Sequence, residues 1–135
     1  MEKYLSLSVK CPHCNTSFMD ENNQVNGEPG IKAFIETPTE RGTIWLCAKY
    51  GCYKHKSTVV LVEDEIVKLS CPHCNQSLVR DTLCKECGAP MIGFYINVGG
   101  KVSICSRVGC KNHYIVFDNT EELLHLFYEK FGSKY

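Results

Sequence analysis

The chain lacks the features by which several common classes of protein are recognised. Fifteen basic and fifteen acidic residues cancel, so the bulk positive charge with which many proteins coat nucleic acid is missing. No apolar run is long enough to cross a bilayer, and Met1 to Lys10 holds no apolar stretch of signal-peptide length. We therefore expect a cytoplasmic protein without membrane contacts. In that reducing compartment, paired cysteines are more often metal ligands than disulfides.

Motifs for metal-dependent hydrolysis and for haem or cluster binding are also missing. The sequence has no His-Glu-x-x-His helix, and no His-x-Glu before a Pro-Cys-x-x-Cys as in zinc deaminases. A Cys-x2-Cys-His haem attachment and closely spaced ferredoxin cysteines are absent too. We therefore expect a protein that is not an enzyme and has no small-molecule substrate.

Cysteine is the residue that the chain has in excess. Each cysteine lies in a close pair, which places two thiolates on one short turn, and two such turns can surround a tetrahedral zinc ion. The segments between the pairs are short and broken by turn formers, so metal is expected to supply stability that a small core cannot. The predicted cofactor is zinc, with two ions, or three if every pair binds. The predicted ligands are Cys11, Cys14, Cys47, Cys52, Cys71, Cys74, Cys84, Cys87, Cys105 and Cys110.

An internal repeat organises the chain. Cys11-Pro-His-Cys-Asn-Thr-Ser17 returns as Cys71-Pro-His-Cys-Asn-Gln-Ser77, at an offset of sixty positions (71 − 11). We expect this offset to hold without a gap as far as Phe34 and Phe94. Duplication of one metal-binding unit is the simplest explanation.

The second copy differs from the first by an extra cysteine pair. After a short deletion, Cys47 to Cys52 matches Cys105 to Cys110. Where the first copy has a polar loop from Asp20 to Gly30, the second carries Cys84 and Cys87. Only the second copy therefore has six cysteines.

Between the cysteine pairs, the pattern favours strands. Gly99-Gly100 separates two β-branched and aromatic segments, which predicts a hairpin. The fold class that follows is small, mostly β and metal-stabilised, with two tandem zinc ribbons built from β-hairpin knuckles. The predicted strands lie within residues 5–9, 31–37, 43–47, 58–62, 91–98, 101–105 and 114–117.

The end of the chain has a different pattern. Asp118 or Asn119 can cap a helix on which Leu123, Phe127 and Phe131 share one apolar face. The fold class therefore includes a C-terminal amphipathic α-helix. The predicted divisions are a first zinc-ribbon repeat with its N-terminal strand (1–63), a second repeat with the extra pair (64–117) and the helix (118–135).

In the first copy, the spacing predicts one four-cysteine site. Cys11 and Cys14 meet Cys47 and Cys52 if all four ligands come from one unit, because the hairpin between them brings the two pairs together. The histidines inside or after the turns, such as His13 and its equivalent in the second copy, are not needed as ligands. Four thiolates already complete a tetrahedral shell.

In the second copy, three pairs compete for places. The repeat joins Cys71 and Cys74 to the pair Cys105/Cys110, whereas the compact ribbon spacing joins them to the pair Cys84/Cys87. Either choice leaves one pair over. The remaining pair can complete a third site with a histidine, stay reduced, or meet a cysteine pair of a partner chain.

A third pairing comes from a family resemblance. Cys84-Lys-Glu-Cys-Gly-Ala-Pro-Met91, then Gly99-Gly-Lys101, then Cys105-Ser-Arg-Val-Gly-Cys-Lys111 resemble the four-cysteine zinc ribbon repeated at the C-terminal end of bacterial type IA topoisomerases. The resemblance covers roughly Cys84 to Lys111. It implies that the pair Cys84/Cys87 binds metal with the pair Cys105/Cys110. It also implies a ribbon module alone, since nothing here resembles the catalytic region of a topoisomerase.

Charge is uneven along the chain although its total vanishes. The segments from Arg41 to Val60 and from Lys101 to Phe117 carry basic residues without acids, and both contain aromatic residues or lie near them. Basic groups beside flat rings are typical of sequence-tolerant single-strand binding, in which stacking contributes about 1–3 kcal/mol per base. The first functional prediction is therefore a non-catalytic protein that binds nucleic acid, single-stranded above all. The candidate contact residues are Lys49, Lys54, Lys56, Lys101, Arg107 and Lys111.

Two alternatives come from other features. The expected helix offers Leu123, Phe127 and Phe131 to a protein partner, which suggests a docking or adaptor subunit of a larger complex. The Cys-x2-Cys-Gly turn from Cys84 to Gly88 also occurs in rubredoxin-like iron sites, which suggests a redox protein. Salt dependence of binding separates the first alternative from nucleic-acid binding. Colour separates the second, because ferric thiolate absorbs visible light and zinc does not.

Overall fold

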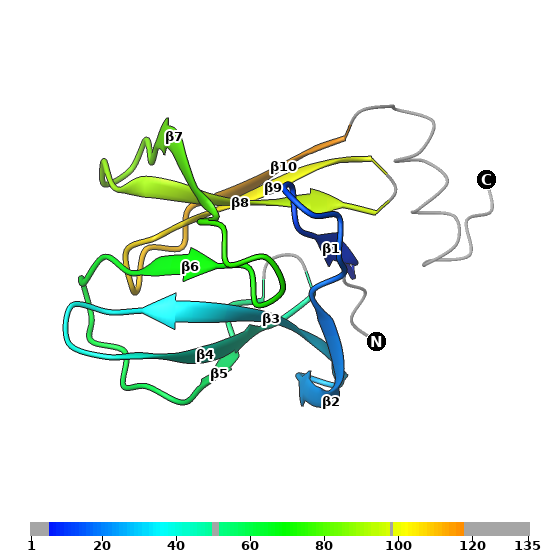
Figure 1. Cartoon of the computed structure of the whole chain (residues 1–135). Helices are drawn as coiled ribbons and strands as arrows, with labels where there is room; N and C mark the ends of the chain where they lie inside the picture. Colours follow the sequence, from blue (N-terminus) through cyan, green and yellow to red (C-terminus); the bar gives the residue numbers. More distant parts are fainter. Residues whose placement is uncertain (1–5, 50–51, 98, 118–135) are drawn as a thin grey trace, which may run out of the picture.

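Two antiparallel β-sheets, packed face to face, form the body of the protein (Figure 1). The computed structural model describes residues 6–49, 52–97 and 99–117. The lower sheet of Figure 1 contains β2 (Met19–Val25), β3 (Glu28–Glu36), β4 (Arg41–Leu46), β5 (His55–Ser57) and β6 (Lys68–Ser70). The upper sheet contains β1 (Val9–Lys10), β7 (Val79–Leu83), β8 (Pro90–Ile96), β9 (Gly100–Cys105) and β10 (His113–Phe117).

The two repeats exchange their first strands. Strand β1 of the first repeat pairs with β8 of the second, with Val9 opposite Ile96. In return, β6 of the second repeat pairs with β3 of the first, with Leu69 opposite Ile35. A strand this short cannot stand alone, because a sheet needs further strands to satisfy its backbone groups. Each repeat therefore completes the sheet of the other.

The core lies between the two sheets. Strand alternation turns Ile92, Phe94 and Ile96 of β8 inward, where all three are buried. The rings of Phe18 and Phe94 meet edge to face, with centroids 5.4 Å apart and planes at 85°. Burial of each such side chain contributes about 1.5–3 kcal/mol. Phe18 of the first repeat and Phe94 of the second are therefore in contact within the core.

The register corrects the expected alignment of the repeats. The backbone N–H of Lys32 donates to the carbonyl of Phe18, and that of Gly93 donates to Leu78. Lys32 and Gly93 are therefore equivalent, an offset of 61 (93 − 32). The expectation of an ungapped match through Phe34 and Phe94 is wrong, because the segment from Leu78 to Gly93, which holds the extra cysteine pair, is one residue longer than the segment from Phe18 to Lys32.

The shift by one residue reverses the faces of the two phenylalanines. A one-residue change of register moves a side chain to the opposite face of its strand. Phe94 is 1% exposed and belongs to the core, whereas Phe34 is 37% exposed on the outer face of the lower sheet. The residue of β8 that takes the place of Phe34 is Tyr95, since both lie directly opposite an exchanged strand.

The predicted mostly β fold is confirmed, but the fold class was wrong in adding a helix. The structure describes no helix in the residues that it covers, and the helix expected over 118–135 falls outside them. In the described part, the apolar face of each sheet is covered by the other sheet, and not by a helix. That part also contains no helix with the length and hydropathy needed to cross a membrane.

Candidate metal centres

Three Cys-x2-Cys turns share one backbone conformation. In each turn, the residue four positions after the first cysteine has a positive φ (62°, 63° and 81°). Asparagine and glycine tolerate this conformation better than other residues. The N–H of the same residue closes the turn on the carbonyl of the first cysteine. These bonds are Asn15 to Cys11 (3.0 Å), Asn75 to Cys71 (2.9 Å) and Gly88 to Cys84 (2.8 Å).

Four of these thiols form a centre that we call the shared centre, made of Cys11, Cys14, Cys71 and Cys74. The Sγ atoms of Cys11 and Cys74 lie 3.7 Å apart, and those of Cys14 and Cys71 lie 3.8 Å apart. All four sulfurs lie within 4.8 Å of one another. A tetrahedral ion with zinc–sulfur bonds of about 2.3 Å needs sulfur–sulfur edges of about 3.8 Å. The group therefore fits a four-sulfur metal site.

The shared centre takes one turn from each repeat. Each turn directly follows an exchanged strand, since Lys10 ends β1 before Cys11 and Ser70 ends β6 before Cys71. The exchange of strands thus brings the two turns together. The prediction that Cys11 and Cys14 share a metal with Cys47 and Cys52 is wrong, because it assumed that all ligands come from one repeat.

The second centre lies within the second repeat and consists of Cys84, Cys87, Cys105 and Cys110. The Sγ atoms of Cys84 and Cys110 lie 3.8 Å apart, and those of Cys87 and Cys105 lie 3.4 Å apart. This is the pairing that the ribbon resemblance implied. The pairings based on the repeat and on the compact spacing are wrong, since the pair Cys71/Cys74 belongs to the shared centre.

Hydrogen bonds to sulfur offset the negative charge of both thiolate shells. Backbone N–H groups of the residue two positions on donate to Cys11, Cys71 and Cys84, each at 3.3 Å. In the second centre the side-chain amide of Asn112 also donates to Cys84 Sγ, at 3.2 Å. Such donors stabilise thiolates, which are the form that binds metal.

The thiols of each centre differ in acidity. Burial raises the pKa of Cys11 to about 12, whereas hydrogen bonding with the Thr16 side chain and backbone lowers the pKa of Cys14 to about 6. Burial also opposes ionisation of Cys84, but N–H donors led by the Asn112 amide outweigh it and bring the pKa of Cys84 to about 6. Metal must displace the protons of the less acidic thiols, so binding at each centre releases protons and weakens as the pH falls.

Arg107, one of the predicted nucleic-acid contacts, is engaged beside the second centre. Its Nη1 donates to the carbonyl of Asp64 at 2.9 Å, and hydrogen bonding with Cys87 raises the pKa of Arg107. The acidic segment from Glu63 to Glu65, which joins the two repeats, also bonds through its backbone to the turn that holds Arg107. Asp64 N donates to Val108 O, and Val108 N donates to Glu65 O. The guanidinium of Arg107 therefore already interacts with Asp64 and Cys87 of the same chain.

Cys47 and Cys52 belong to neither centre. Their backbone makes the same hydrogen bonds as that of the pair Cys105/Cys110 in the second repeat. Cys47 N donates to Lys54 O, and Cys105 N donates to Asn112 O, both at 3.1 Å. Among the described residues, no third cysteine, histidine or carboxylate forms a metal-binding group with them. The structure thus gathers eight of the ten predicted ligands into two groups, which is consistent with two zinc ions.

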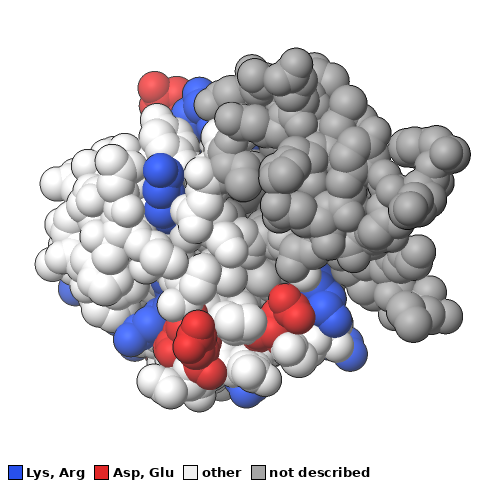
Figure 2. Space-filling view, turned by 90° about the vertical axis from the view of Figure 1, so that its right-hand side faces the viewer, with Lys and Arg blue, Asp and Glu red and all other residues white. Residues whose placement is uncertain are grey.

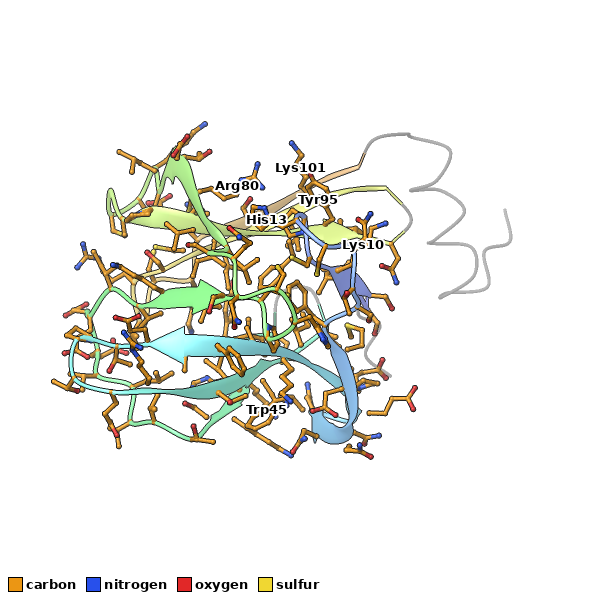
Figure 3. The ribbon with its side chains drawn as sticks, viewed as in Figure 1. Lys10, His13, Trp45, Arg80, Tyr95 and Lys101 are labelled. Atoms are coloured by element: carbon orange, nitrogen blue, oxygen red, sulfur yellow. The ribbon has the colours of Figure 1, made fainter. Side chains whose placement is uncertain are left out.

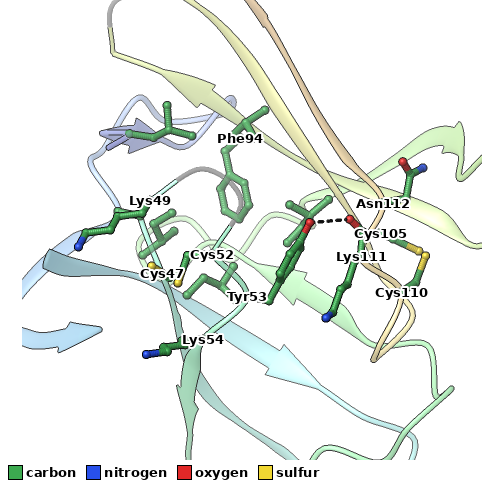
Figure 4. Close-up of a pocket in the computed structure, with 16 residues that line it drawn as sticks. Cys47, Lys49, Cys52, Tyr53, Lys54, Phe94, Cys105, Cys110, Lys111 and Asn112 are labelled. Atoms are coloured by element: carbon green, nitrogen blue, oxygen red, sulfur yellow. Dashed lines mark hydrogen bonds between the residues drawn. The ribbon is translucent and has the colours of Figure 1, made fainter. Parts of the chain in front are cut away.

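Three of the predicted basic contacts surround one pocket beside this spare pair. Lys49, Lys54 and Lys111 line it together with Tyr53, as Figure 4 shows. The Nζ atom of Lys111 lies 5.3 Å from the centre of the Tyr53 ring, and the Tyr53 hydroxyl donates to the Lys111 carbonyl at 3.0 Å. The segment after Cys52 in the first repeat therefore contacts the segment after Cys110 in the second.

Strand register brings together two further groups of basic residues. The sequence alone had indicated only one lysine of each group, Lys101 and Lys56. Residues directly opposite each other on neighbouring strands share a face, with Cβ atoms about 4.5–5.5 Å apart. On the outer face of each sheet, an aromatic residue is flanked in this way by two lysines. The upper row is Lys10, Tyr95 and Lys101, and the lower row is Lys32, Trp45 and Lys56.

The two rows differ in the charge beside them. In the upper sheet the Arg80 side chain lies over Gly93, next to Tyr95 along β8. At the equivalent position of the lower sheet, Asp20 accepts a hydrogen bond from the indole N–H of Trp45 at 2.9 Å. Figure 3 shows Arg80 and the upper row on one outer face of the molecule and Trp45 on the opposite one. A hollow of about 260 Å³ adjoins the upper row.

Comparison with known proteins identifies no relative, because no family model, no curated protein and no solved structure matches the chain. The class that the fold and the sites define is a protein of two packed β-sheets with two tetracysteine metal centres. The predicted zinc-ribbon character is confirmed to that extent. The likeness to topoisomerase ribbons depends on the sequence alone.

Proposed function

We propose that the protein is a non-catalytic, zinc-stabilised cytoplasmic module that binds single-stranded nucleic acid on the outer face of its upper sheet. The observation that carries this proposal is the upper row, in which Tyr95 lies between Lys10 and Lys101 on three adjacent strands. The non-catalytic character is supported by the two centres. A four-thiolate shell leaves no open position for a water molecule or a substrate.

Single strands are favoured over duplexes because of the geometry of the row. Tyr95 is half-buried and Lys101 exposed, so the ring is held in place while charge remains accessible beside it. A base can stack on a fixed ring while lysines on both sides contact the phosphates that flank it. The hollow next to the row, bounded by Lys10, Tyr95 and the Gly99-Gly100 hairpin, has room for one planar base and is smaller than a typical pocket for a drug-sized ligand.

Local charge is the physical basis of the proposal, since the chain has no net charge. Among the described residues visible in Figure 2, Lys and Arg are scattered among uncharged and acidic side chains and form no broad basic surface. Long-range attraction to polyphosphate is therefore weak. We expect modest affinity that decreases steeply with salt, because a few phosphate contacts supply most of the attraction.

The upper row is a better candidate than the lower row. Arg80 adds a third cation beside Tyr95, whereas Asp20 places a carboxylate on the Trp45 indole. A carboxylate at that position repels phosphate. The resemblance of Cys84 to Lys111 to ribbons of topoisomerases, which are enzymes that act on DNA, agrees with the choice of the sheet that contains this segment.

Two matched double variants test the proposal. Binding to a fluorescent oligothymidylate is measured by anisotropy over a range of salt concentrations, for Lys10→Ala/Lys101→Ala and for Lys32→Ala/Lys56→Ala. We expect the first pair to weaken binding and to reduce the salt slope by about 0.7 for each lost phosphate contact. The second pair, which removes equal charge from the lower row, leaves the slope near that of the wild type. Equal losses in both variants would contradict a defined site on the upper sheet.

Substitution of the ring separates stacking from charge. Tyr95→Ala is expected to cost about 1–3 kcal/mol of binding free energy, while Tyr95→Phe, which keeps the ring, retains the affinity. Zinc content measured in the same samples controls for folding. Binding that does not change with salt, or that needs a protein partner, favours the docking hypothesis. Residues 118–135, on which that hypothesis depended, lie outside the described part of the chain.

A further inference from the structure

The two cysteines left out of the metal centres line the same pocket. Cys47 is 8% exposed and Cys52 is half-buried, and each thiol shifts the pKa of the other, which places them close together. The pocket has a volume of about 150 Å³ and lies between the knuckles of the two repeats, with Phe94 at one wall. Figure 4 shows the two sulfurs side by side at its edge. A small group that enters this pocket therefore reaches both sulfurs.

Among the described residues, basic side chains lie around the pair, and the charge of Lys54 helps to lower the pKa of Cys52. Lys49, Lys54 and Lys111 line the pocket, and no acidic side chain is found among the described residues that line it. The side-chain amide of Asn26 donates to Cys52 Sγ at 3.5 Å. Reactive cysteines are typically found in such partly exposed, electropositive places, because these surroundings stabilise the thiolate that acts as nucleophile.

The two sulfurs have different chemical character. Burial opposes ionisation of Cys52, but hydrogen bonds from the Cys47 thiol, the backbone near Lys54 and the Asn26 amide outweigh it and lower the pKa of Cys52. Burial raises the pKa of Cys47 to about 11. The more accessible sulfur is thus the better nucleophile, and the buried sulfur keeps its proton until a second step needs it.

We propose that Cys47 and Cys52 form a thiol–disulfide exchange site that accepts small anionic disulfides. The Cys52 thiolate attacks one sulfur of the disulfide RSSR, which forms a mixed disulfide and releases the first RS⁻. The Cys47 thiol then loses its proton to solvent and attacks Cys52 Sγ, which forms the Cys47–Cys52 disulfide and releases the second RS⁻. The two cysteines are oxidised and RSSR is reduced to two thiols.

Metal binding is a weaker explanation of the pair. The position that Cys84 and Cys87 occupy in the second repeat is taken in the first by the turn at Asn26 and Gly27, which brings an amide and no thiol. Among the described residues, the pair therefore has no further ligands. The charge of Lys54 beside Cys52 also disfavours a cation. These features suit a free dithiol better than half of a zinc shell.

Oxidised glutathione, an anionic disulfide, is the probe, and cystamine, a cationic one, is the charge control. The zinc-loaded full chain is treated with each disulfide under identical conditions, and the products are mapped by mass spectrometry without reduction. We expect a Cys47–Cys52 crosslink with both zinc ions retained, formed several-fold faster with oxidised glutathione than with cystamine. Lys54→Gln is expected to reduce this preference.

Two serine variants define the order of the steps. Cys52→Ser is expected to abolish the reaction, and Cys47→Ser is expected to stop at a mixed disulfide of Cys52 with one glutathionyl group. Zinc content reports folding of both variants, and the map of the wild type decides the question if either one fails to fold. The proposal is overturned if Cys47 and Cys52 remain reduced while cysteines of the metal centres react. It is also overturned if the purified chain holds a third zinc ion that protects the pair.

Discussion

The first and second repeats make the same backbone hydrogen bonds around their last cysteine pair, yet only the second repeat completes a metal centre there. The difference lies in the hairpin opposite. The second repeat presents Cys84 and Cys87 to the pair Cys105/Cys110, whereas the first presents the side chain of Asn26 to Cys52. The knuckle backbone is therefore not sufficient for metal binding. The residues that face it decide whether two thiols become ligands or stay free.

The outer faces of the two sheets differ in a similar way. Both carry an aromatic ring between two lysines, but Arg80 accompanies Tyr95 in the upper sheet and Asp20 accompanies Trp45 in the lower. The two rings lie at different backbone positions, but Asp20 and Arg80 occupy equivalent ones, and these two side chains set the charge beside each ring. The outer face of the upper sheet thus carries charge suited to phosphate. On the outer face of the lower sheet, the Trp45 ring is already hydrogen-bonded to Asp20.

The largest expected effect separates the shared centre from the spare pair. Cys71→Ser removes a ligand that joins the two repeats, so zinc is lost there and both exchanged strands are released. Structural zinc supplies about 10–16 kcal/mol to small zinc-finger peptides, so we expect the chain to unfold. Native mass spectrometry and thermal unfolding measure the loss.

Cys47→Ser is the matched control for that variant, since it also replaces a buried cysteine. We expect it to keep two zinc ions and to unfold near the temperature of the wild type. If Cys47→Ser released as much metal as Cys71→Ser, the spare pair would be a ligand pair and the assignment of the shared centre would fail.

A smaller loss is expected at the second centre. Cys87→Ser removes a ligand that only the second repeat uses, so the zinc content falls from two ions to one while the shared centre keeps its metal. Hydrogen exchange is expected to rise in β7 and β8, next to the lost knuckle, and to change little in β3 and β4. Equal exchange in both sheets would show that the second centre supports the whole molecule.

An effect of intermediate size on the unfolding free energy is expected from Phe94 and Phe34, which the register places on opposite faces of their sheets. Phe94→Ala removes a buried ring that packs on Phe18 and is expected to cost about 3–5 kcal/mol of unfolding free energy. Phe34→Ala, the match that an ungapped offset predicted for it, removes a ring on the outer face and is expected to cost less than about 1 kcal/mol. Urea unfolding of zinc-loaded protein measures both. Equal costs would favour the ungapped alignment.

Sequence alone predicted what is local and missed what depends on distant pairing. The cysteine turns and most of the expected strands follow from residues close in the chain, as the hairpin at Gly99-Gly100 between β8 and β9 shows. The pairing of Cys11 with Cys74 was not predictable in this way. It follows from strand exchange between the repeats, which no spacing within one repeat reveals.

The upper row shows the same limit. Lys101 was a candidate because its segment is basic, but Lys10 and Tyr95 join it only through register, which sets which residues lie opposite each other. The predicted contact Arg107 had the expected charge but is engaged by Asp64. Charge along a sequence therefore indicates candidates, and tertiary contacts decide which remain accessible.

The smallest expected effect concerns Asp20, the acid that distinguishes the lower face from the upper. Hydrogen bonds from Trp45 and Asn23 lower the pKa of this carboxyl from its ordinary value of 3.8. Because the folded pKa lies below the unfolded one, the carboxylate stabilises the fold above the unfolded pKa, and this contribution is lost as the pH falls through the folded pKa.

Asp20→Asn is therefore expected to cost about 0.5–1.5 kcal/mol, the typical worth of a hydrogen bond. The cost stays constant from about pH 5 to 8, because Asp20 is ionised in both states over that range. Urea unfolding of zinc-loaded protein at several pH values measures it. A cost that varied across that range would mean that Asp20 acts through a group that titrates there, such as a thiol of the metal centres, and not through its bond to Trp45.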